Sequence, residues 1–353
     1  TLNTFGRIFR VNIFGESHGE SVGANIDGCP AGLSLSVEDF ELDINRRKGG
    51  MQKGTTPRKE EDLPLFKSGL FNGRTTGAPI TIIFENNNIR SSDYDQIKSV
   101  FRPGHADFVA NQKFGGFEDY RGSGHFSGRL TLCLVAAGVI AKKLLNNISV
   151  KSNILEIGGE VDIEKGLQKA IQAKDSVGGI VECTVNNIPV GLGEPFFDSF
   201  ESLMAHMAFA IPAIKGIEFG DGFKAAKMFG KEHNDAIVNP EGKTASNHAG
   251  GVVGGITNGN EIVFRVAVKP TSSTPQIQNT FNSETNKMED FAIRGRHDLC
   301  IALRVPVVLE AAAAIVLTDL MLLLCLSFFY LCYLYMVNTT QHAQRFLPNA
   351  LLW

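Results

Sequence analysis

The sequence predicts a mixed fold of helices and strands, of the α+β (mixed α/β) class, in a single domain. Segments with helical spacing of apolar residues and short apolar segments typical of strands occur together along the whole chain. No regular repeat of 20–50 residues and no long linker divides it, which favours one compact domain. The chain has 353 residues, 43% of them hydrophobic, so it can bury a large core.

The first segments are predicted to be two strands, residues 5–14 and 22–26, joined by a loop that contains glycine. A helix over residues 36–48 follows them. Ser36 suits the N-cap position, and Asp39 stands three residues later, as in a capping box. The last turn of this segment is basic and is followed by glycine, which is typical of a helix end.

The middle of the chain contains the clearest periodicity. An apolar run over residues 80–85 predicts a buried strand. Apolar residues recur at helical spacing over residues 127–146, which predicts a helix. The remaining expected elements are strands over residues 151–162, 179–185 and 261–268, and helices over residues 199–211 and 306–324.

The C-terminal segment from Leu320 to Val337 is almost wholly apolar and approaches the roughly 20 residues that a membrane helix needs. We interpret it instead as a buried or intersubunit helix, broken at Ser327. Asp319 begins the stretch, and no cluster of basic residues follows it, so we do not expect a membrane partner.

Composition excludes several classes of function. The net charge is −3, without the basic bias of a protein that binds duplex nucleic acid. The six cysteines are scattered, with no CxxC pair and no zinc-ligand spacing, which indicates a reduced, cytoplasmic protein without a metal site. No basic-then-apolar leader opens the sequence, so we expect no signal peptide.

Two histidines lie in segments suited to proton transfer, because imidazole exchanges protons near neutral pH. The segment Gly15–Gly19 follows an apolar run, and such a strand-to-loop transition can expose His18 to a ligand. In Arg102–Asp107, proline and glycine fix a turn that places His105 between a cation and a carboxylate. The alternative is an ordinary turn histidine bonded to Asp107.

Cations and hydroxyls next to glycines indicate binding of anions. The basic, glycine-containing stretch 46–59 is either a loop that closes on an anion or a solvated helix end. Ser127 follows glycines at a predicted helix start, with Arg129 in the first turn, which favours an anion site over a plain N-cap. The pattern is neither a P-loop nor a dinucleotide-binding turn.

Two further blocks lie near the C-terminal end. Residues 269–273 combine an ammonium group with three hydroxyls, which suits a phosphate or a ring edge. Asp298 follows Arg296 by two residues, so the carboxylate could act as a base while the guanidinium holds an anion. The alternative for this pair is a surface salt bridge, which would contribute little.

In this combination and order, the blocks resemble those of chorismate synthase over roughly residues 3–320. The segments that carry the resemblance are Asn3–Gly6, Phe14–Gly19, Asp27–Pro30, Phe101–Asp107, Gly124–Arg129 with Thr131, Ser246–Gly251, Lys269–Ser273 and Gly295–Asp298.

The resemblance implies a single-domain β-α-β sandwich over residues 1–320. The apolar tail over residues 321–353 has no counterpart in the family pattern, and its role is unclear. It implies a homotetramer in the cytoplasm. It also implies a carbon–oxygen lyase of the shikimate pathway, which makes aromatic amino acids. The implied reaction is the 1,4-anti elimination of phosphate from 5-enolpyruvylshikimate 3-phosphate, giving chorismate. It requires reduced FMN without net redox change, and NADPH is a candidate reductant.

The resemblance also implies roles for individual residues. His18 acts as an acid on the phosphate, His105 protonates the reduced flavin or keeps it protonated, and Asp298 receives a proton through flavin N5. The implied substrate contacts are Ser17, Arg47, Lys53, Arg102, Ser127, Arg129 and Arg296. The implied FMN contacts are His125, Phe126, Ser127, Ala213, Gly254, Lys269, Pro270, Thr271, Ser272, Ser273 and Arg296.

The chain departs from the family pattern at a few positions. Lys53 stands where arginine is frequent, Leu299 replaces a frequent proline, and Pro212 replaces a residue that is often polar. Two alternative functions remain open at this point. One is an NADPH-dependent flavin reductase, and the other is a non-catalytic protein that binds flavin or an anion.

Overall fold

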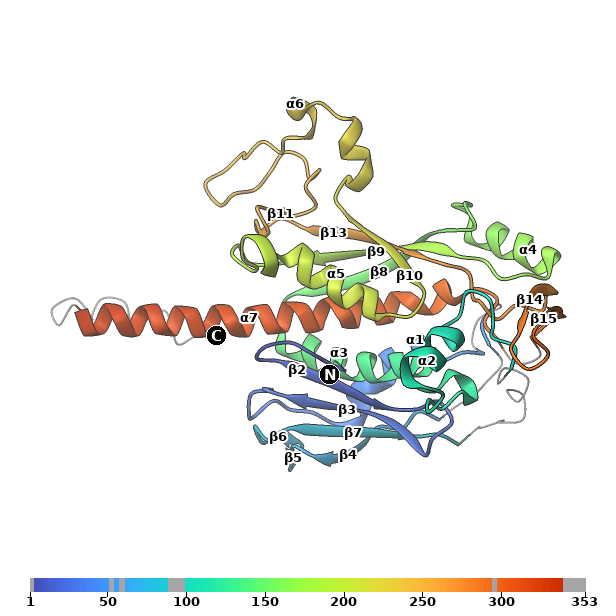
Figure 1. Ribbon diagram of the computed structural model, residues 1–353. Helices are drawn as coiled ribbons and strands as arrows, with labels where there is room; N and C mark the ends of the chain where they lie inside the picture. The colour runs from blue at the N-terminus through green and yellow to red at the C-terminus, as the bar shows by residue number, and fades with distance from the viewer. Residues whose placement is uncertain (1–2, 51–53, 57–60, 88–98, 294–296, 339–353) are drawn as a thin grey trace.

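The computed structural model describes residues 3–50, 54–56, 61–87, 99–293 and 297–338, with side chains up to residue 327. Helices and strands are mixed throughout, as the sequence predicts. Figure 1 shows one sheet on each side of a layer of helices, with α7 running between them. This arrangement is the β-α-β sandwich that the resemblance implied.

The first sheet is antiparallel and comes from the N-terminal part of the chain. Its order is β1 (Thr4–Phe5), β2 (Arg10–Gly15), β3 (Ser21–Asp27), β7 (Ile80–Glu85) and β4 (Leu65–Ser68). The predicted strand at 80–85 is confirmed. The predicted strand over residues 5–14 is wrong in its middle: Gly6 turns the chain with φ +96°, and the backbone of residues 7–9 binds a side chain instead of a neighbouring strand.

The second sheet is also antiparallel. Its order is β10 (Ile214–Phe219), β13 (Ile262–Val268), β9 (Gly179–Asn186) and β8 (Ser149–Ile157). The last strand ends earlier than predicted because Gly158 and Gly159 adopt positive φ and turn the chain. Three small hairpins complete the strands: β5 (Leu70–Phe71) with β6 (Arg74–Thr75), β11 (Val252–Val253) with β12 (Ile256–Thr257), and β14 (Gln278–Asn282) with β15 (Lys287–Phe291).

The helices are α1 (Glu41–Arg47), α2 (Asp107–Phe114), α3 (Thr131–Leu144), α4 (Ile163–Ala173), α5 (Phe200–Ala210), α6 (Gly230–His233) and α7 (Val305–Asn338). The predicted helix over residues 36–48 begins as a 3₁₀ turn, with Asp39 accepting the Ser36 backbone N–H as in a capping box. The predicted helix at 127–146 begins as regular α-helix only at Thr131, after a 3₁₀ turn.

Helices α3 and α7 form the centre of the core. A Cβ on Gly138 of α3 would lie 2.3 Å from the Cβ of Ala311 on α7, so only glycine permits this close approach. Two helical segments are apolar and long enough by composition to cross a membrane: Arg121–Leu144, which ends with α3, and Ile301–Ser327, which contains the first part of α7. About three quarters of each is buried inside the protein. Burial explains the apolar character of α3, and of α7 up to Leu320, without a bilayer.

Helix α7 continues to Asn338, so the predicted break at Ser327 is wrong. Serine retains its backbone N–H and does not interrupt helical hydrogen bonding. With 34 residues, α7 is about 50 Å long. Its side chains are buried up to Leu320, whereas Leu324 and Leu326 are exposed, and Figure 1 shows the helix extending beyond the two sheets.

A buried ion cluster fixes α1 against this central layer. Glu310 of α7 accepts two hydrogen bonds of 2.7 Å from Arg46 of α1 and one of 3.0 Å from Lys142 of α3. These contacts hold the pKa of the Glu310 carboxyl below its usual range, although burial acts to raise it. The cluster positions the last turn of α1, and therefore also Arg47, which follows Arg46 and ends the helix.

A second carboxylate on α7 binds the N-terminal segment. Asp319 accepts hydrogen bonds from the backbone N–H groups of Arg7, Ile8 and Phe9 at 3.0, 2.7 and 2.9 Å. Asp319 and Phe9 are both buried, so the Phe9 N–H has no alternative access to water, and the N–H groups of Arg7 and Ile8 are partly buried. The contact joins the start of the first sheet to the central helix.

We expect Asp319→Ala to lower the free energy of unfolding by about 2–3 kcal/mol, because buried backbone donors lose a charged acceptor. Urea denaturation followed by circular dichroism measures this. The matched control is Asp198→Ala, which removes the exposed partner of Arg7 on the same segment and should change stability little. Equal effects of the two substitutions would contradict the assignment.

Candidate active site

A cavity of about 660 Å³ lies where β2, α3, α5 and α7 meet several loops. Its volume is within the usual range for ligand sites. Most of the residues predicted as a site from the sequence line it: Ser17, Arg47, Arg102, His105, His125, Phe126, Ser127, Arg129, Ala213, Lys269, Pro270, Thr271, Ser272, Ser273 and Asp298.

Four predicted residues are not placed in this lining. His18 and Gly254 are described but do not line the cavity. His18 lies just behind its wall, whereas Gly254 is exposed in the tight turn between β11 and β12. Lys53 and Arg296 lie outside the described residues.

The lining carries an excess of positive charge. Among the described residues, six cationic side chains face two carboxylates: Arg47, Lys48, Arg102, Arg129, Lys269 and Arg304 against Asp62 and Asp298. Asp107, which lies outside the lining, pairs with Arg102, so cations exceed these three carboxylates by three. Burying unpaired cations is costly, so this excess favours a ligand that carries several negative charges. No group of three or more metal-ligating side chains occurs in the described part of the chain.

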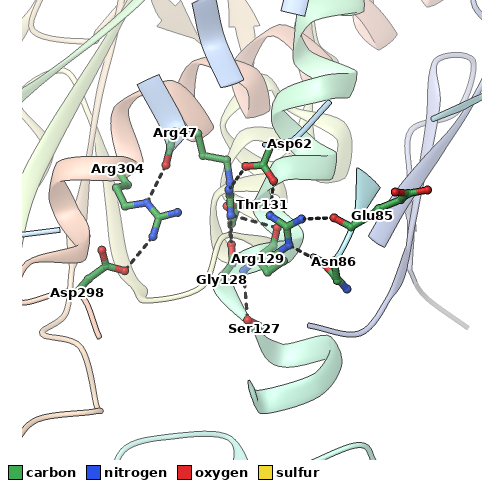
Figure 2. Close-up of polar contacts among 10 residues, drawn as sticks. All are labelled: Arg47, Asp62, Glu85, Asn86, Ser127, Gly128, Arg129, Thr131, Asp298 and Arg304. Atoms are coloured by element: carbon green, nitrogen blue, oxygen red, sulfur yellow. Dashed lines mark hydrogen bonds and ion pairs between the residues drawn. The ribbon is translucent and has the colours of Figure 1, made fainter. Parts of the chain in front are cut away.

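Arg47 and Arg129 line the cavity and form its arginine wall. Figure 2 shows their polar contacts. Arg47 donates to the Thr131 hydroxyl at 2.9 Å and to the carbonyl oxygens of Gly128 and Arg129 at 3.0 and 3.1 Å. Burial, followed by the nearby guanidinium of Arg304, lowers the pKa of Arg47. The site therefore holds this cation at an energetic cost that a bound anion would offset.

Asp62 lies between the two arginines. Its carboxylate pairs closely with Arg129 and lies 3.7 Å from Arg47. Arg129 also donates at 2.8 Å to Asn86, whose side chain in turn holds the carbonyl oxygens of Glu16 and Gly19. The arginine wall is thus connected to the loop that carries His18, as Figure 2 shows in part.

The predicted turn at residues 102–107 forms a compact ion cluster. Arg102 binds both carboxylate oxygens of Asp107, at 2.7 and 2.6 Å, and His105 Nδ1 lies 2.8 Å from the same carboxylate. Burial acts to raise the pKa of Asp107, but the bonds from Arg102 and His105 outweigh it and hold that pKa well below its usual range. The ionised Asp107 can therefore orient the imidazole at neutral pH.

The bond between His105 and Asp107 is the contact expected of an ordinary turn histidine. The same bond is compatible with a role in catalysis. The loop at residues 269–273 adds long-range contacts to this turn. Ser273 accepts a 3.1 Å bond from Arg102, and Lys269 donates at 3.0 Å to the Gly104 carbonyl. Two blocks that are distant in sequence therefore meet on one side of the cavity.

Asp298 lies on another part of the lining, with both oxygens engaged. One accepts the Thr56 backbone N–H at 2.8 Å, and the other accepts a 3.0 Å bond from Arg304. Arg304 also donates to the carbonyl oxygen of Arg47 at 2.8 Å (Figure 2). The partner of Asp298 in the described structure is thus Arg304, and its side chain is held at a fixed position against the arginine wall.

His18 packs behind Gly122, which itself lines the cavity. Gly122 has φ +55°, and a Cβ built on it would lie only 2.0 Å from His18 Nδ1. The side chain of Ser17, the preceding residue, lies in the lining. The absence of a side chain at Gly122 therefore lets the imidazole approach the cavity.

We expect Gly122→Ala to displace His18 and to lower both stability and turnover. The matched control is Gly73→Ala, because Gly73 has a similar φ of +71° but open space around its Cβ position. Left-handed strain costs each variant about 1 kcal/mol, so the two differ in the collision with His18 and in a tight 3.0 Å contact with the Ser17 hydroxyl. Thermal melting and turnover measure the difference, and indistinguishable variants would contradict the contact.

The segment from residue 125 to 127 forms the rim near α3. His125 Nδ1 lies 2.8 Å from the Gly15 carbonyl, which ties the rim to β2. The Ser127 hydroxyl accepts the backbone N–H of Arg129 at 3.3 Å, as an N-cap does. Ser127 is therefore an N-cap, as the alternative interpretation held. The cavity also reaches this helix start, where an anion is favoured.

Three residues of this site were not predicted from the sequence: Asp62, Asn86 and Arg304. Asp62 and Asn86 contact Arg129, which is 67 and 43 residues away, and Arg304 contacts Asp298, which is 6 residues away, but none of the three lies in a recognisable motif. Asp62 could have been noticed as the last member of a short acidic run, but such runs are usually solvated. Its burial appears only in the folded chain.

Comparisons with known proteins agree on one family. A family model described as chorismate synthase matches residues 9–322. A chorismate synthase of Chitinophaga pinensis is 70% identical over 323 residues, covering 91% of this chain and 97% of the relative. One from Methanocaldococcus jannaschii is 42% identical over 365 residues, covering 91% and 96%. A crystal structure of chorismate synthase matches with a TM-score of 0.70 and 28% identity, covering 90% of this chain and 93% of that one.

Proposed function

Because the chain belongs to the chorismate synthase family, we propose that the cationic cavity binds 5-enolpyruvylshikimate 3-phosphate next to reduced FMN. The protein is an enzyme, a lyase of aromatic biosynthesis, and its substrate is a small molecule. It eliminates phosphate from 5-enolpyruvylshikimate 3-phosphate to give chorismate. The family requires a reduced flavin, and we infer that FMN is the flavin used.

One observation carries the proposal: the excess of cations in a cavity that also contains His105 and Asp298. The substrate bears two carboxylates and a phosphate, so several cations must converge on it. Arg47, Arg102 and Arg129 are buried and already oriented by fixed partners, and therefore lose little side-chain entropy on binding. We assign them to the anionic groups of the substrate, together with Lys53 and Arg296.

The lining also suits a flavin. Val11, Ile13 and Leu134 give it apolar surface for a planar ring, and Lys269 with the hydroxyls of residues 271–273 offers donors for a phosphate or a ring edge. Burial, followed by Lys215, lowers the pKa of Lys269, so a nearby anion would be favourable. When bound, reduced flavin supplies transient electron density to the substrate.

The chain's own residues hold and move protons around this pocket. We assign His18 to the phosphate as an acid, acting across Gly122. His105, oriented by Asp107, holds the proton that keeps the reduced flavin neutral. Asp298, fixed by Arg304 and Thr56, accepts the proton that the substrate loses. We assign Ser17 to the substrate and residues 125–127 and Ala213 to FMN, whereas Gly254, which the resemblance also implied, does not line this cavity.

The direct test is phosphate release from 5-enolpyruvylshikimate 3-phosphate under anaerobic conditions with dithionite-reduced FMN. We expect release to require both substrate and reduced flavin, and none with oxidised FMN. No release would overturn the proposal. The same assay with Asp298→Asn, which retains the shape of the side chain but not its charge, tests the assignment of the base.

A second activity, reduction of FMN by NADPH, would make the enzyme independent of an external reductant. We infer that NADPH is a candidate reductant from the family resemblance alone. Anaerobic consumption of NADPH with FMN and without substrate tests this. Absence of consumption, with phosphate release intact, would show that the reduced flavin comes from elsewhere.

We also infer a homotetramer in the cytoplasm. Several large aromatic side chains are largely exposed in one chain, among them Phe196, Phe197, Phe223 and Phe229. Exposed apolar surface of this kind marks interfaces. Light scattering coupled to gel filtration measures the assembly state, and a monomer at micromolar concentration would contradict this inference.

A further inference from the structure

Ser123 has an unusual backbone conformation for its residue type. It lies between Gly122 and Gly124 with φ +69° and ψ 11°, in the left-handed region. Non-glycine residues rarely adopt this region, and those that do are concentrated at functional sites. The residues on both sides, Gly122 and Gly124, are glycines. A glycine at position 123 would also relieve the strain there, yet this position carries a serine side chain.

The Ser123 hydroxyl lies between two groups of the proposed site. It accepts a 2.8 Å hydrogen bond from Arg102 Nη2 and lies 3.3 Å from Nε2 of His105. The other ring nitrogen of His105, Nδ1, lies 2.8 Å from the Asp107 carboxylate. Arg102 Nη2 also lies 3.2 Å from Nδ1, but its two hydrogens go to its shorter contacts, Asp107 at 2.6 Å and Ser123 at 2.8 Å. Asp107 therefore fixes the proton of the neutral ring on Nδ1, which leaves Nε2 as an acceptor.

Arg102 determines which way the hydroxyl points. A guanidinium can only donate, so it occupies one lone pair of the Ser123 oxygen. The hydroxyl proton is then directed to the neighbouring acceptor, Nε2 of His105. Both nitrogens of the neutral ring are thus engaged, one by a carboxylate and the other by a hydroxyl.

His105 needs to be held on both sides because it stands between two cavities. A second cavity of about 410 Å³ lies beside the first, and His105 and Ser123 line both. An imidazole held only through Nδ1 could pivot about that bond toward the second cavity. A bond at Nε2 opposes this rotation.

We propose that Ser123 is a positioning residue for His105, whose hydroxyl, oriented by Arg102, donates to Nε2 and keeps the imidazole facing the catalytic cavity. The inference rests on the proposed role of His105 in proton transfer. It also couples substrate to proton transfer: an anion that binds Arg102 acts, through one hydroxyl, on the ring that handles the proton.

The position allows a test that separates the hydroxyl from the backbone. Ser123→Ala removes the hydroxyl and retains the left-handed strain, whereas Ser123→Gly removes both. Ser123→Thr retains the hydroxyl and adds strain, because β-branched residues tolerate positive φ poorly. Stability should therefore decrease in the order Gly, Ser, Thr at position 123. Turnover should instead depend on whether the residue carries a hydroxyl.

The first measurement is direct and needs no flavin or substrate. In the full-length chain labelled with ¹⁵N-histidine, the Nε2 resonance of neutral His105 is assigned by its loss in His105→Gln. We expect it to move to lower field in Ser123→Ala and in Ser123→Gly, because it loses its donor. It should stay near the wild-type position in Ser123→Thr. An unchanged resonance in both Ala and Gly would overturn the proposal.

The second measurement is turnover. We expect kcat to fall about fivefold in the Ala and Gly variants alike, the effect of one lost hydrogen bond, although Gly melts at a higher temperature than wild type. A loss of turnover that tracks melting temperature would mean a structural role only. If instead His105→Ala leaves turnover intact, the proposed role of His105 fails while the resonance shift still tests the contact.

Discussion

Replacing His105 with alanine is expected to lower turnover by about 10- to 1,000-fold without unfolding the protein. The imidazole is one-fifth exposed and lines the cavity, and Asp107 and Ser123 hold its two nitrogens. Its removal deletes a proton carrier and leaves the arginine wall in place. Anaerobic phosphate release at saturating substrate measures kcat.

The control for His105→Ala is His233→Ala, on α6, away from the cavity. That variant should retain wild-type turnover, and both variants should show wild-type circular dichroism. The loss in His105→Ala should appear in kcat more than in KM, because the anion-binding arginines remain. Wild-type turnover in His105→Ala would remove this residue from the proton-transfer pathway.

Replacing Arg129 with alanine is expected to lower both stability and activity. Arg129 is buried and pairs with Asp62, so its removal leaves a buried carboxylate whose remaining cationic partner among the described residues is Arg47, at 3.7 Å. Breaking a buried ion pair from one side costs about 3 kcal/mol of folding free energy. The substrate also loses a preorganised cation, and we expect kcat/KM to fall by about 100-fold or more.

The double variant Arg129→Ala with Asp62→Asn separates these two effects. Neutralising Asp62 should restore much of the lost stability, because no unpaired charge remains buried. It should not restore kcat/KM, because the cation is still missing. Recovery of activity together with stability would show that Arg129 acts on the fold and not on the substrate.

The sequence predicted much of the fold because many of its elements have strong local patterns. The helix with Leu130 and Leu134 in its periodic stripe and the apolar strand at residues 80–85 were predicted at nearly their final positions. The interruption at residues 6–9 was missed because its cause, Asp319, lies some 310 residues away. The continuation of α7 past Ser327 was missed because we gave one polar residue too much weight.

The candidate site was predicted unevenly for the same reason. Blocks such as residues 102–107 and 269–273 are recognisable as local patterns, and the structure brings them together around one cavity. The contacts that join these two blocks to each other, from Arg102 to Ser273 and from Lys269 to Gly104, are long-range. Nothing local marks Arg304 as the partner of Asp298, or Ser123 as the residue between Arg102 and His105.

The contact between Asp319 and the N–H groups of residues 7–9 has a consequence for biosynthesis. Residues 7–9 leave the ribosome early, and the carboxylate that binds them emerges about 310 residues later, on the helix that separates the two sheets. The first sheet packs against α3, whereas β8 and β9 of the second sheet pack against α7 and cannot complete their burial until that last helix arrives. The nascent chain must therefore keep this apolar surface exposed for much of its translation, and a molecular chaperone that shields it would raise the yield of folded enzyme.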